Sequence, residues 1–288
     1  MNWKIICINK SLHKVLLDNG NIIDTTVRGK LRNNHVFPLV GDNVLVDTNN
    51  KQILEIKDRK NSLERPLIAN IDKLFIVMSN KIPEFSSYLI DKFLLISKYN
   101  NIEPIIIITK MDLLNELEKE EVFKYINYYK KLNLKIYLNT EIDKIKKEVS
   151  NSIVALCGQT GAGKSTLLNK IDPNLKLKTG EVSESLGRGK HTTRLVELIK
   201  VDDGFIADTP GFSSLDLNVP RKEIRFYYDD FDSNCKYNKS CLHIKEDGCS
   251  IIEDVNNNKI PLWRYNNYLK FMEETKNDNK CFNTIKWN

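Results

Sequence analysis

Short runs that alternate between apolar and polar side chains fill residues 1–66. The alternation is clearest over residues 14–17, 21–24 and 52–57, and residues 40–46 form a Gly-Asp turn that opens into a further run. A period of two is typical of strands with one buried face. About five such strands with Gly-marked turns favour a small closed β-barrel of the oligonucleotide-binding type, although a barrel that only packs against its neighbour would show the same pattern.

From residue 67 onward, fully apolar runs alternate with amphipathic segments. This order predicts strands over 72–78, 104–109, 134–138, 152–157, 194–201 and 204–207, and helices over 86–99, 114–131 and 142–149. Strands that alternate with helices indicate a parallel sheet in an α/β fold. We therefore expect three units: a barrel at 1–66 that ends in a polar linker over 59–66, an α/β unit at 67–215, and a C-terminal unit at 216–288 with a helix over 261–275.

The apolar run 153–157 ends in Gly-x-x-x-x-Gly-Lys-Ser and passes into a helix-prone segment. This order is the phosphate-binding loop of nucleotide hydrolases, and a chance Gly-rich turn rarely has a strand before it and a helix after it. Lys164 would reach the β- and γ-phosphates as a catalytic residue, and the Ser165 hydroxyl would bind Mg²⁺. The predicted nucleotide-binding residues of this loop are Gly158, Gln159, Thr160, Gly161, Ala162, Gly163, Lys164, Ser165 and Thr166.

A second phosphate element follows the apolar run 204–207. Asp208 would hold Mg²⁺, largely through water, and the N–H of Gly211 would contact the γ-phosphate. An Asp-x-x-Gly turn alone carries little information. Its position at a strand end, some 45 residues after a phosphate loop, favours the functional interpretation.

A guanine-reading element ends the apolar run 104–109. Its usual form is Asn-Lys-x-Asp, in which the carboxylate accepts two hydrogen bonds from guanine and the lysine stem covers the ring. Here Lys110 and Asp112 are present, and Thr109 replaces the Asn, a change that we expect to loosen the loop. Adenine offers no such pair of donors, so the element favours GTP or GDP. A plain charged strand-to-helix turn is the alternative.

The order of these elements differs from that of ordinary GTPases, in which the phosphate loop comes first and the guanine element last. Here residues 109–112 precede residues 158–165, and Asp208 comes after both. The same sheet can form when its ends are joined and the chain is cut elsewhere, because termini often lie close together. The sequence therefore predicts a circularly permuted GTPase, whose segment after Asp208 leads directly into the C-terminal unit.

Two further roles fall in the Gly-rich basic segment 187–194. Either Thr192 or Thr193 would complete the Mg²⁺ shell, and the residues leave that choice open. Phe212 stands where many GTPases carry a Gln that orients water. We therefore expect His191 to position the attacking water as a catalytic residue, although a basic loop with a histidine also suits RNA binding.

Three of the six cysteines gather within fifteen residues, together with one histidine: Cys235, Cys241, His243 and Cys249. Three thiolates and one imidazole complete a tetrahedral Zn²⁺ set with no open position for chemistry, so we expect one structural zinc per chain. Cys7 and Cys157 are expected to be small buried apolar residues.

The net charge is +6, and residues 1–65 carry 11 Lys/Arg against 7 Asp/Glu. Such a surplus suits a polyanionic partner such as nucleic acid, but a solvated basic surface explains it almost as well. No apolar run approaches the ~18 residues that a membrane span needs. The charged N-terminus does not suit a signal peptide, so we expect a cytoplasmic protein.

Taken together, the chain resembles the ribosome small subunit-dependent GTPase A family, the circularly permuted GTPases of bacterial small-subunit biogenesis. The resemblance covers nearly the whole chain: residues 28–32, 40–42, 59–66, 109–112, the phosphate loop, 191–193, 208–211 and the Cys/His set. It implies a slow GTPase that the small ribosomal subunit stimulates. Such a protein would act late in subunit maturation, contact rRNA through its barrel and zinc unit, and leave after hydrolysis, as a monomer without membrane association.

Two other functions remain open from the residues themselves. The first is an RNA-binding module that keeps nucleotide only as a structural ligand, whose phosphate release small subunits would not stimulate under any condition. A P-loop ATPase or kinase would bind ATP and GTP equally, against the role given to Asp112.

Overall fold

The N-terminal strands close into a barrel. They are β1 (Trp3–Asn9), β2 (Leu12–Leu16), β3 (Ile22–Val27), β4 (Asn43–Asp47) and β5 (Gln52–Ile56). Their order is β1-β2-β3-β5-β4, and β4 pairs back onto β1. The pair β3–β5 is parallel and the others are antiparallel. Alternate side chains fill the interior, among them Ile5, Val15, Val44, Val46 and Ile53, so the predicted barrel is confirmed.

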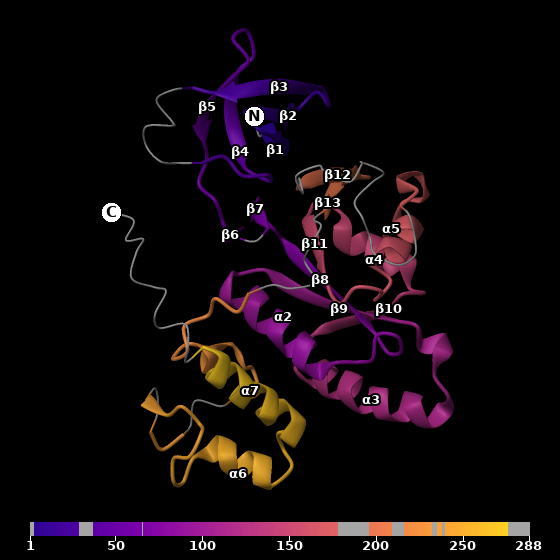
Figure 1. Cartoon of the computed structure of the whole chain (residues 1–288), viewed down its shortest axis with the longest axis vertical. Coiled ribbons are helices and arrows are strands. Elements are labelled where there is room, and N and C mark those ends of the chain that lie inside the picture. Colours follow the sequence, from indigo (N-terminus) through magenta and orange to yellow (C-terminus); the bar gives the residue numbers. More distant parts are fainter. Residues whose placement is uncertain are drawn as a thin grey trace.

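The computed structural model describes residues 3–28, 37–64, 66–177, 196–208, 216–231, 235–237 and 240–275. Figure 1 shows the barrel at one end of the long axis, the α/β unit in the middle and the C-terminal helices at the other end. Among the described residues no helix has both the length and the apolar character needed to cross a bilayer.

The segment expected as a polar linker forms a short hairpin instead. Strands β6 (Ser62–Glu64) and β7 (Leu67–Ala69) pair with each other. Before the hairpin, the guanidinium of Arg59 donates to the buried carboxylate of Asp42 at 2.7 and 2.8 Å. Gly41 has φ +93°, and a Cβ there would lie 2.1 Å from the carbonyl oxygen of Ala69. Long-range contacts to the barrel therefore order this segment despite its polar composition.

The central sheet contains β8 (Lys73–Ser79), β9 (Glu103–Thr109), β10 (Lys135–Leu138), β11 (Ile153–Cys157), β12 (Glu197–Val201) and β13 (Gly204–Asp208). Its order is β10-β9-β8-β11-β13-β12, parallel except for the antiparallel pair β12–β13. All six strands were predicted, with ends that differ by at most three residues.

In the described part of the chain, four helices cover the two faces of this sheet. Helices α2 (Ser87–Tyr99) and α3 (Glu116–Lys131) pack on the face that includes Leu74 and Ile106, while α4 (Ile142–Val149) and α5 (Lys164–Ile171) pack on the face of Phe75 and Ile105. Consecutive residues of one strand point to opposite faces of the sheet. Because these strands are apolar at nearly every position, both faces of the sheet are apolar.

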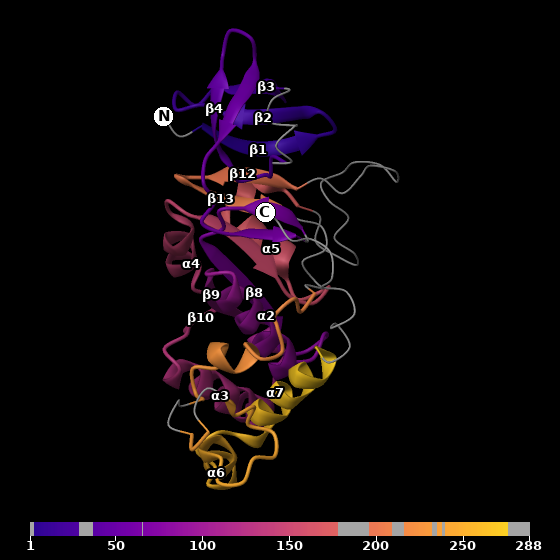
Figure 2. The same ribbon diagram turned by 90° about the vertical axis from the view of Figure 1, so that its left-hand side faces the viewer.

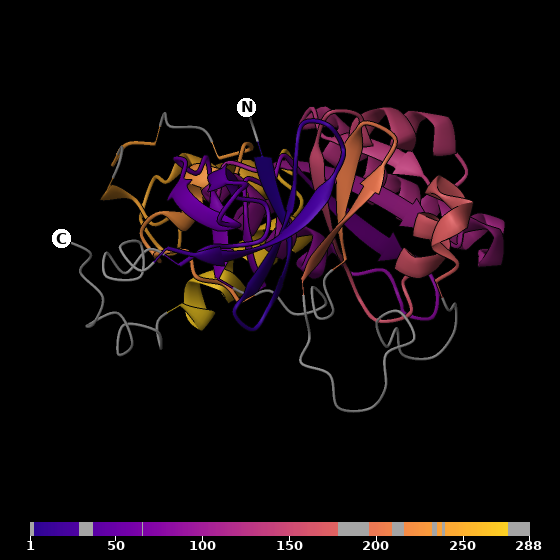
Figure 3. The same ribbon diagram turned by 90° about the horizontal axis from the view of Figure 1, so that it is seen from above.

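Strand β1 of the barrel also pairs antiparallel with β12, with Cys7 opposite Glu197. Among the described residues, the barrel and the central sheet therefore form one continuous eleven-stranded sheet. Figures 2 and 3 show the barrel strands, in indigo, beside the orange strands β12 and β13. Strand β12 follows directly on residues 178–195, which lie outside the described part of the chain.

The C-terminal unit contains a 3-10 turn, η3 (Ile224–Tyr227), and the helices α6 (Ser250–Asn256) and α7 (Leu262–Glu274). Helix α7 confirms the predicted helix, whereas α6 was not expected. Helix α7 packs against α2 through a buried network in which the guanidinium of Arg264 pairs with the carboxylates of Asp91 and Asp230. The Tyr129 hydroxyl and the Asn267 amide also donate to Asp91, at 2.6 and 2.7 Å.

Candidate functional site

The loop between β11 and α5 has a backbone that only glycine adopts readily. Gly158, Gly161 and Gly163 have φ values of +134°, +80° and +94°, and a Cβ at Gly158 would lie 2.1 Å from the carbonyl oxygen of Val77. The ammonium of Lys164 donates to the carbonyl oxygens of Gly158 and Gln159 at 2.7 and 2.8 Å. Burial lowers the pKa of this ammonium. The loop therefore holds a partly desolvated cation at its opening, which suits an anionic ligand.

Helix α5 begins at Lys164, so the free N–H groups of its first turn and the positive end of its dipole lie at the loop. Ser165 is half-buried in that turn, and Thr166 is exposed. This is where a phosphate-bound Mg²⁺ would find a hydroxyl ligand.

The guanine-reading element meets the phosphate loop directly. Thr109 ends β9, is 2% exposed, and donates its hydroxyl to the carbonyl oxygen of Ala162 at 2.7 Å. The side chain of Thr109 thus joins the two elements, and the expected loosening of the loop stays a prediction. Lys110 follows with φ +60°, and Asp112 lies exposed in the 3-10 turn η1 (Met111–Leu113).

Asp208 is the last residue of β13, the parallel neighbour of β11. Because Ala207 pairs with Ala155, the backbone of Asp208 lies at the same sheet edge as the phosphate loop. The carboxyl ends of β9, β11 and β13 thus bring residues 109, 158 and 208 to one edge, as ligand sites in open α/β sheets require.

Four of the predicted site residues lie outside the described residues: His191, Thr192, Thr193 and Gly211. The side chain of Asp208 is not described either, although its backbone is. The structure thus brings together the guanine element, the phosphate loop and the backbone of residue 208.

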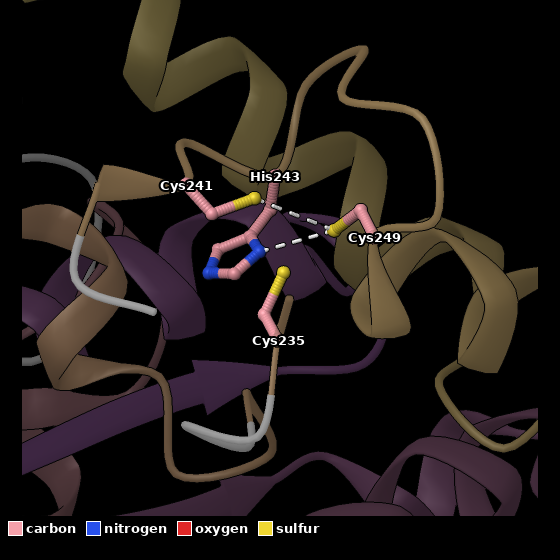
Figure 4. Close-up of side chains that lie close together, drawn as sticks. All are labelled: Cys235, Cys241, His243 and Cys249. Atoms are coloured by element: carbon pink, nitrogen blue, oxygen red, sulfur yellow. Dashed lines mark hydrogen bonds between the residues drawn. The ribbon is translucent and has the colours of Figure 1, made fainter. Parts of the chain in front are cut away.

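Cys235, Cys241, His243 and Cys249 converge in the C-terminal unit (Figure 4). All four are buried, and their ligand atoms lie within 4.8 Å of one another. The Sγ atoms of Cys241 and Cys249 are 3.7 Å apart, and Nδ1 of His243 is 3.2 Å from Sγ of Cys249. Tetrahedral Zn²⁺ with bonds of about 2.3 Å requires sulfurs about 3.8 Å apart. The four residues therefore fit one zinc ion. Cys7 and Cys157 are buried in the cores, as predicted.

The chain around this cluster is held by residues that the sequence analysis missed. The carboxylate of Glu246 accepts from the backbone N–H groups of Leu242, Ile244 and Lys245. Burial alone would raise the pKa of Glu246, but these donors outweigh it and lower the pKa to about 2. The hydroxyl of Tyr265 donates to the carbonyl of His243 at 2.7 Å. A carboxylate three residues after one ligand and three before the next was the available signal.

A separate polar cleft of about 460 Å³ lies between the barrel, the segment after it and the central sheet. Lys4, Lys60, Asp72 and Ile153 are among its lining residues. Because Asp72 and Ile153 stand at the amino ends of β8 and β11, this cleft lies at the sheet edge opposite the phosphate loop.

Comparison with known proteins gave two family matches. The model described as RsgA GTPase matches residues 51–218, and the RsgA N-terminal domain matches residues 4–53. A relative from Bacillus pumilus, named small ribosomal subunit biogenesis GTPase RsgA, is 42% identical over 272 residues, which is 90% of this chain and 91% of the relative. A relative of the same name from Clostridium beijerinckii is 39% identical and covers 97% of this chain and 99% of its own.

Solved structures lead to the same family. YjeQ from Thermotoga maritima is 31% identical with a TM-score of 0.82, and the match covers 96% of this chain and 98% of that one. YloQ, described as a circularly permuted GTPase, is 32% identical with a TM-score of 0.80, over 99% of this chain and 96% of that one. The permuted order of the guanine and phosphate elements agrees with that description. The chain therefore belongs to the RsgA GTPase family and is a GTPase.

Proposed function

We propose that this protein hydrolyses GTP as a late assembly factor of the small ribosomal subunit, binds rRNA and leaves the subunit after hydrolysis. Relatives that carry the name small ribosomal subunit biogenesis GTPase match it along about nine-tenths of both chains. The single observation that carries the enzymatic part is the hydrogen bond from Thr109 to Ala162, because it joins a guanine-reading element to a phosphate loop.

In this proposal the phosphate loop, residues 158–166, wraps the β- and γ-phosphates with its backbone N–H groups. Lys164 exchanges its bonds to the Gly158 and Gln159 carbonyls for bonds to the phosphates, where it stabilises the charge that develops in the transition state. Asp112 accepts from the guanine edge, and Lys110 covers the ring. Thr109 sets the distance between the base site and the phosphate site.

Ser165 and Asp208, with Thr192 or Thr193, would hold Mg²⁺, which supplies charge neutralisation at the phosphates. We assign His191 the role of positioning the attacking water, and Gly211 a backbone contact to the γ-phosphate. In sequence, His191 precedes β12 and Gly211 follows β13. Strand β12 starts and β13 ends at the phosphate edge of the sheet, because Glu197 pairs with Asp208.

We further propose three functional units: an RNA-binding barrel at 1–66, a permuted GTPase unit at 67–215 and a zinc-binding unit at 216–288. One Zn²⁺ held by Cys235, Cys241, His243 and Cys249 would stabilise the last unit by fixing the loop segments from which these ligands come. The basic surplus of the barrel suits rRNA. Because the segment after Asp208 leads into the zinc unit, loss of the γ-phosphate would be transmitted there. We expect a cytoplasmic monomer.

Phosphate release from GTP, measured with and without purified small subunits, tests this proposal. We expect slow release alone and strong stimulation by small subunits, but not by large ones. Hydrolysis that small subunits leave unchanged would contradict the ribosomal role. Equal displacement of bound GDP by ATP and GTP would contradict the base specificity.

Co-sedimentation gives a second, independent measurement. The protein should sediment with small subunits in the presence of a non-hydrolysable GTP analogue and remain in the supernatant with GDP. Equal sedimentation with both nucleotides would contradict release after hydrolysis while leaving the GTPase assignment intact.

A further inference from the structure

The loop that follows β8, residues 80–83, contacts the guanine-reading turn, residues 109–113, at several points. The sequence of this β8 loop, Asn-Lys-Ile-Pro, matches no nucleotide-binding motif. In the permuted sheet β8 lies between β9 and β11. The β8 loop is therefore at the edge where the base and phosphate elements meet.

Asn80 reaches the first half of the guanine-reading turn. Its side-chain amide donates to the carbonyl oxygen of Thr109 at 3.0 Å and lies 2.8 Å from Sδ of Met111. Only the NH₂ group can face the Thr109 carbonyl, because a flipped amide would place two oxygen atoms in contact. Asn80 is 7% exposed, so water does not compete freely for these bonds.

Burial of the Asn80 amide carries a free-energy penalty, which indicates that its N–H donors have a role at this position. Its Oδ1 atom is buried and has no hydrogen-bond partner among the described residues. An unpaired buried acceptor destabilises a fold, so an apolar residue would serve better if position 80 only filled space. The amide is therefore best explained by the shape that it gives to the backbone at Thr109 and Met111.

Lys81 reaches the second half of the same turn from the surface. Its ammonium donates to the carbonyl of Leu113 at 3.3 Å and to the carboxylate of Glu118 at 2.9 Å. Glu118 also completes the capping box of α3 with Asn115. Lys81 thus ties the end of the turn to the start of the next helix.

The rest of the β8 loop lies between the base and phosphate elements. The ammonium of Lys110 donates to the carbonyl of Ile82, and the position of a Cβ on Gly161 would be 3.6 Å from Cδ of Pro83. The loop therefore binds Lys110, the lysine proposed to cover the base, and lies close to the phosphate loop.

We propose that Asn80 and Lys81 are positioning residues for guanine recognition: they hold residues 109–113 in the shape that presents Asp112 to the base. This inference rests on the proposed role of Asp112. It adds a third chain segment, contributed by β8, to the nucleotide site, and neither residue needs to contact the base itself.

Dissociation constants for GDP and IDP, measured by competition against a fluorescent GDP analogue, test the proposal. Inosine diphosphate (IDP) lacks the 2-amino group that Asp112 would bind. The dissociation constant for IDP divided by that for GDP therefore measures how well that carboxylate is placed, and this quotient is the ratio used below. Asn80→Ala should weaken GDP binding about tenfold and IDP binding much less, so that the ratio falls about fivefold. Lys81→Met, at a half-exposed site, should lower the ratio about twofold. Lys131→Met, an exposed lysine at the end of α3, is the matched control and should leave the ratio unchanged.

A structural role alone predicts a different pattern. If Asn80 only supports the fold, Asn80→Ala should lower the melting temperature and weaken both nucleotides equally, and that result would overturn the proposal. We expect instead a melting temperature within about 3 °C of the unaltered protein. If Asn80→Ala and Lys81→Met both leave the ratio unchanged, the positioning role is overturned and the base-reading role of Asp112 stands. Equal binding of GDP and IDP by the unaltered protein would overturn the positioning role together with the base-reading role of Asp112.

Discussion

The hydroxyl of Thr109 donates a 2.7 Å hydrogen bond to the main-chain carbonyl of Ala162, across 53 residues of sequence. Both residues are buried; Thr109 ends β9, and Ala162 lies in the loop that follows β11, two strands away in the sheet. The bond sets how far the base-reading residues stand from the phosphate loop. A nucleotide that spans both sites therefore has its base and its phosphates bound by elements that are fixed relative to each other.

Removing that hydroxyl should weaken nucleotide binding. Thr109→Val keeps the shape but leaves the Ala162 carbonyl unpaired, so we expect an affinity for GDP about tenfold lower. Thr109→Ser retains the donor and should stay within about threefold of the unaltered protein. Titration with a fluorescent GDP analogue measures both. Equal loss in the two variants would show that packing of the methyl group, and not the hydrogen bond, matters.

The carboxylate of Asp112 should decide base preference. Asp112→Asn replaces an acceptor by an amide that can donate to the carbonyl of xanthine, which stands where guanine has its amine. We expect GTP binding to fall and XTP binding to rise, so that the preference reverses. Because Asp112 is exposed, the fold should be unaffected. Undiminished preference for GTP, measured by competition, would contradict the assignment.

Substitution of His191 should separate catalysis from binding. A side chain that only positions water contributes to the transition state and not to nucleotide affinity. His191→Ala should therefore lower turnover in the presence of small subunits by about 10²-fold, while GTP affinity changes little. Single-turnover phosphate release and equilibrium binding measure the two effects. Parallel loss of both would assign His191 a structural role.

Metal analysis should find about one zinc per chain. Cys249→Ser should abolish zinc binding, because Cys249 lies close to both Cys241 and His243. Cys7→Ala, a buried cysteine of the barrel, is the control and should retain the metal. Chelation should unfold the C-terminal unit, observed as a change in the fluorescence of Trp263 on α7. A metal-free chain with a fully folded C-terminal unit would refute the zinc site.

The buried Arg264 should anchor α7 to the GTPase unit. Arg264→Met leaves the carboxylates of Asp91 and Asp230 without their cation, so we expect a loss of about 3–5 kcal/mol in the free energy of unfolding. Asn266→Ala, on the exposed side of α7, should cost less than about 0.5 kcal/mol. Adding Asp91→Asn to Arg264→Met should restore part of the loss, because it removes one uncompensated charge. Urea unfolding measures the free energy of unfolding of each variant. If the losses from Arg264→Met and Asp91→Asn simply add in the double variant, that result would argue against the network.

Long-range hydrogen bonds and, for one helix, short length explain the differences between expectation and structure. Residues 59–66 have a polar composition that predicts a linker, yet Asp42 binds Arg59 and the chain turns back as β6 and β7. Helix α6 is only seven residues long and starts directly after the ligand Cys249, so its pattern was too short to recognise. The roles of Asn80 and Arg264 depend on partners distant in sequence, which no local pattern encodes.

The amino-acid sequence by itself determined the strands and helices of the α/β unit, the phosphate loop, the permuted order of the nucleotide elements and the Cys/His ligand set. These features are local: apolar periodicity, glycine at positive φ and the spacing of chemically specific side chains. Only the tertiary structure decided that Thr109 joins the base and phosphate elements, that β1 extends the central sheet through β12, and that Arg264 fastens α7. Each of these is a contact between residues more than fifty positions apart, and its formation depends on how the completed sheet brings distant strand ends and helix faces together.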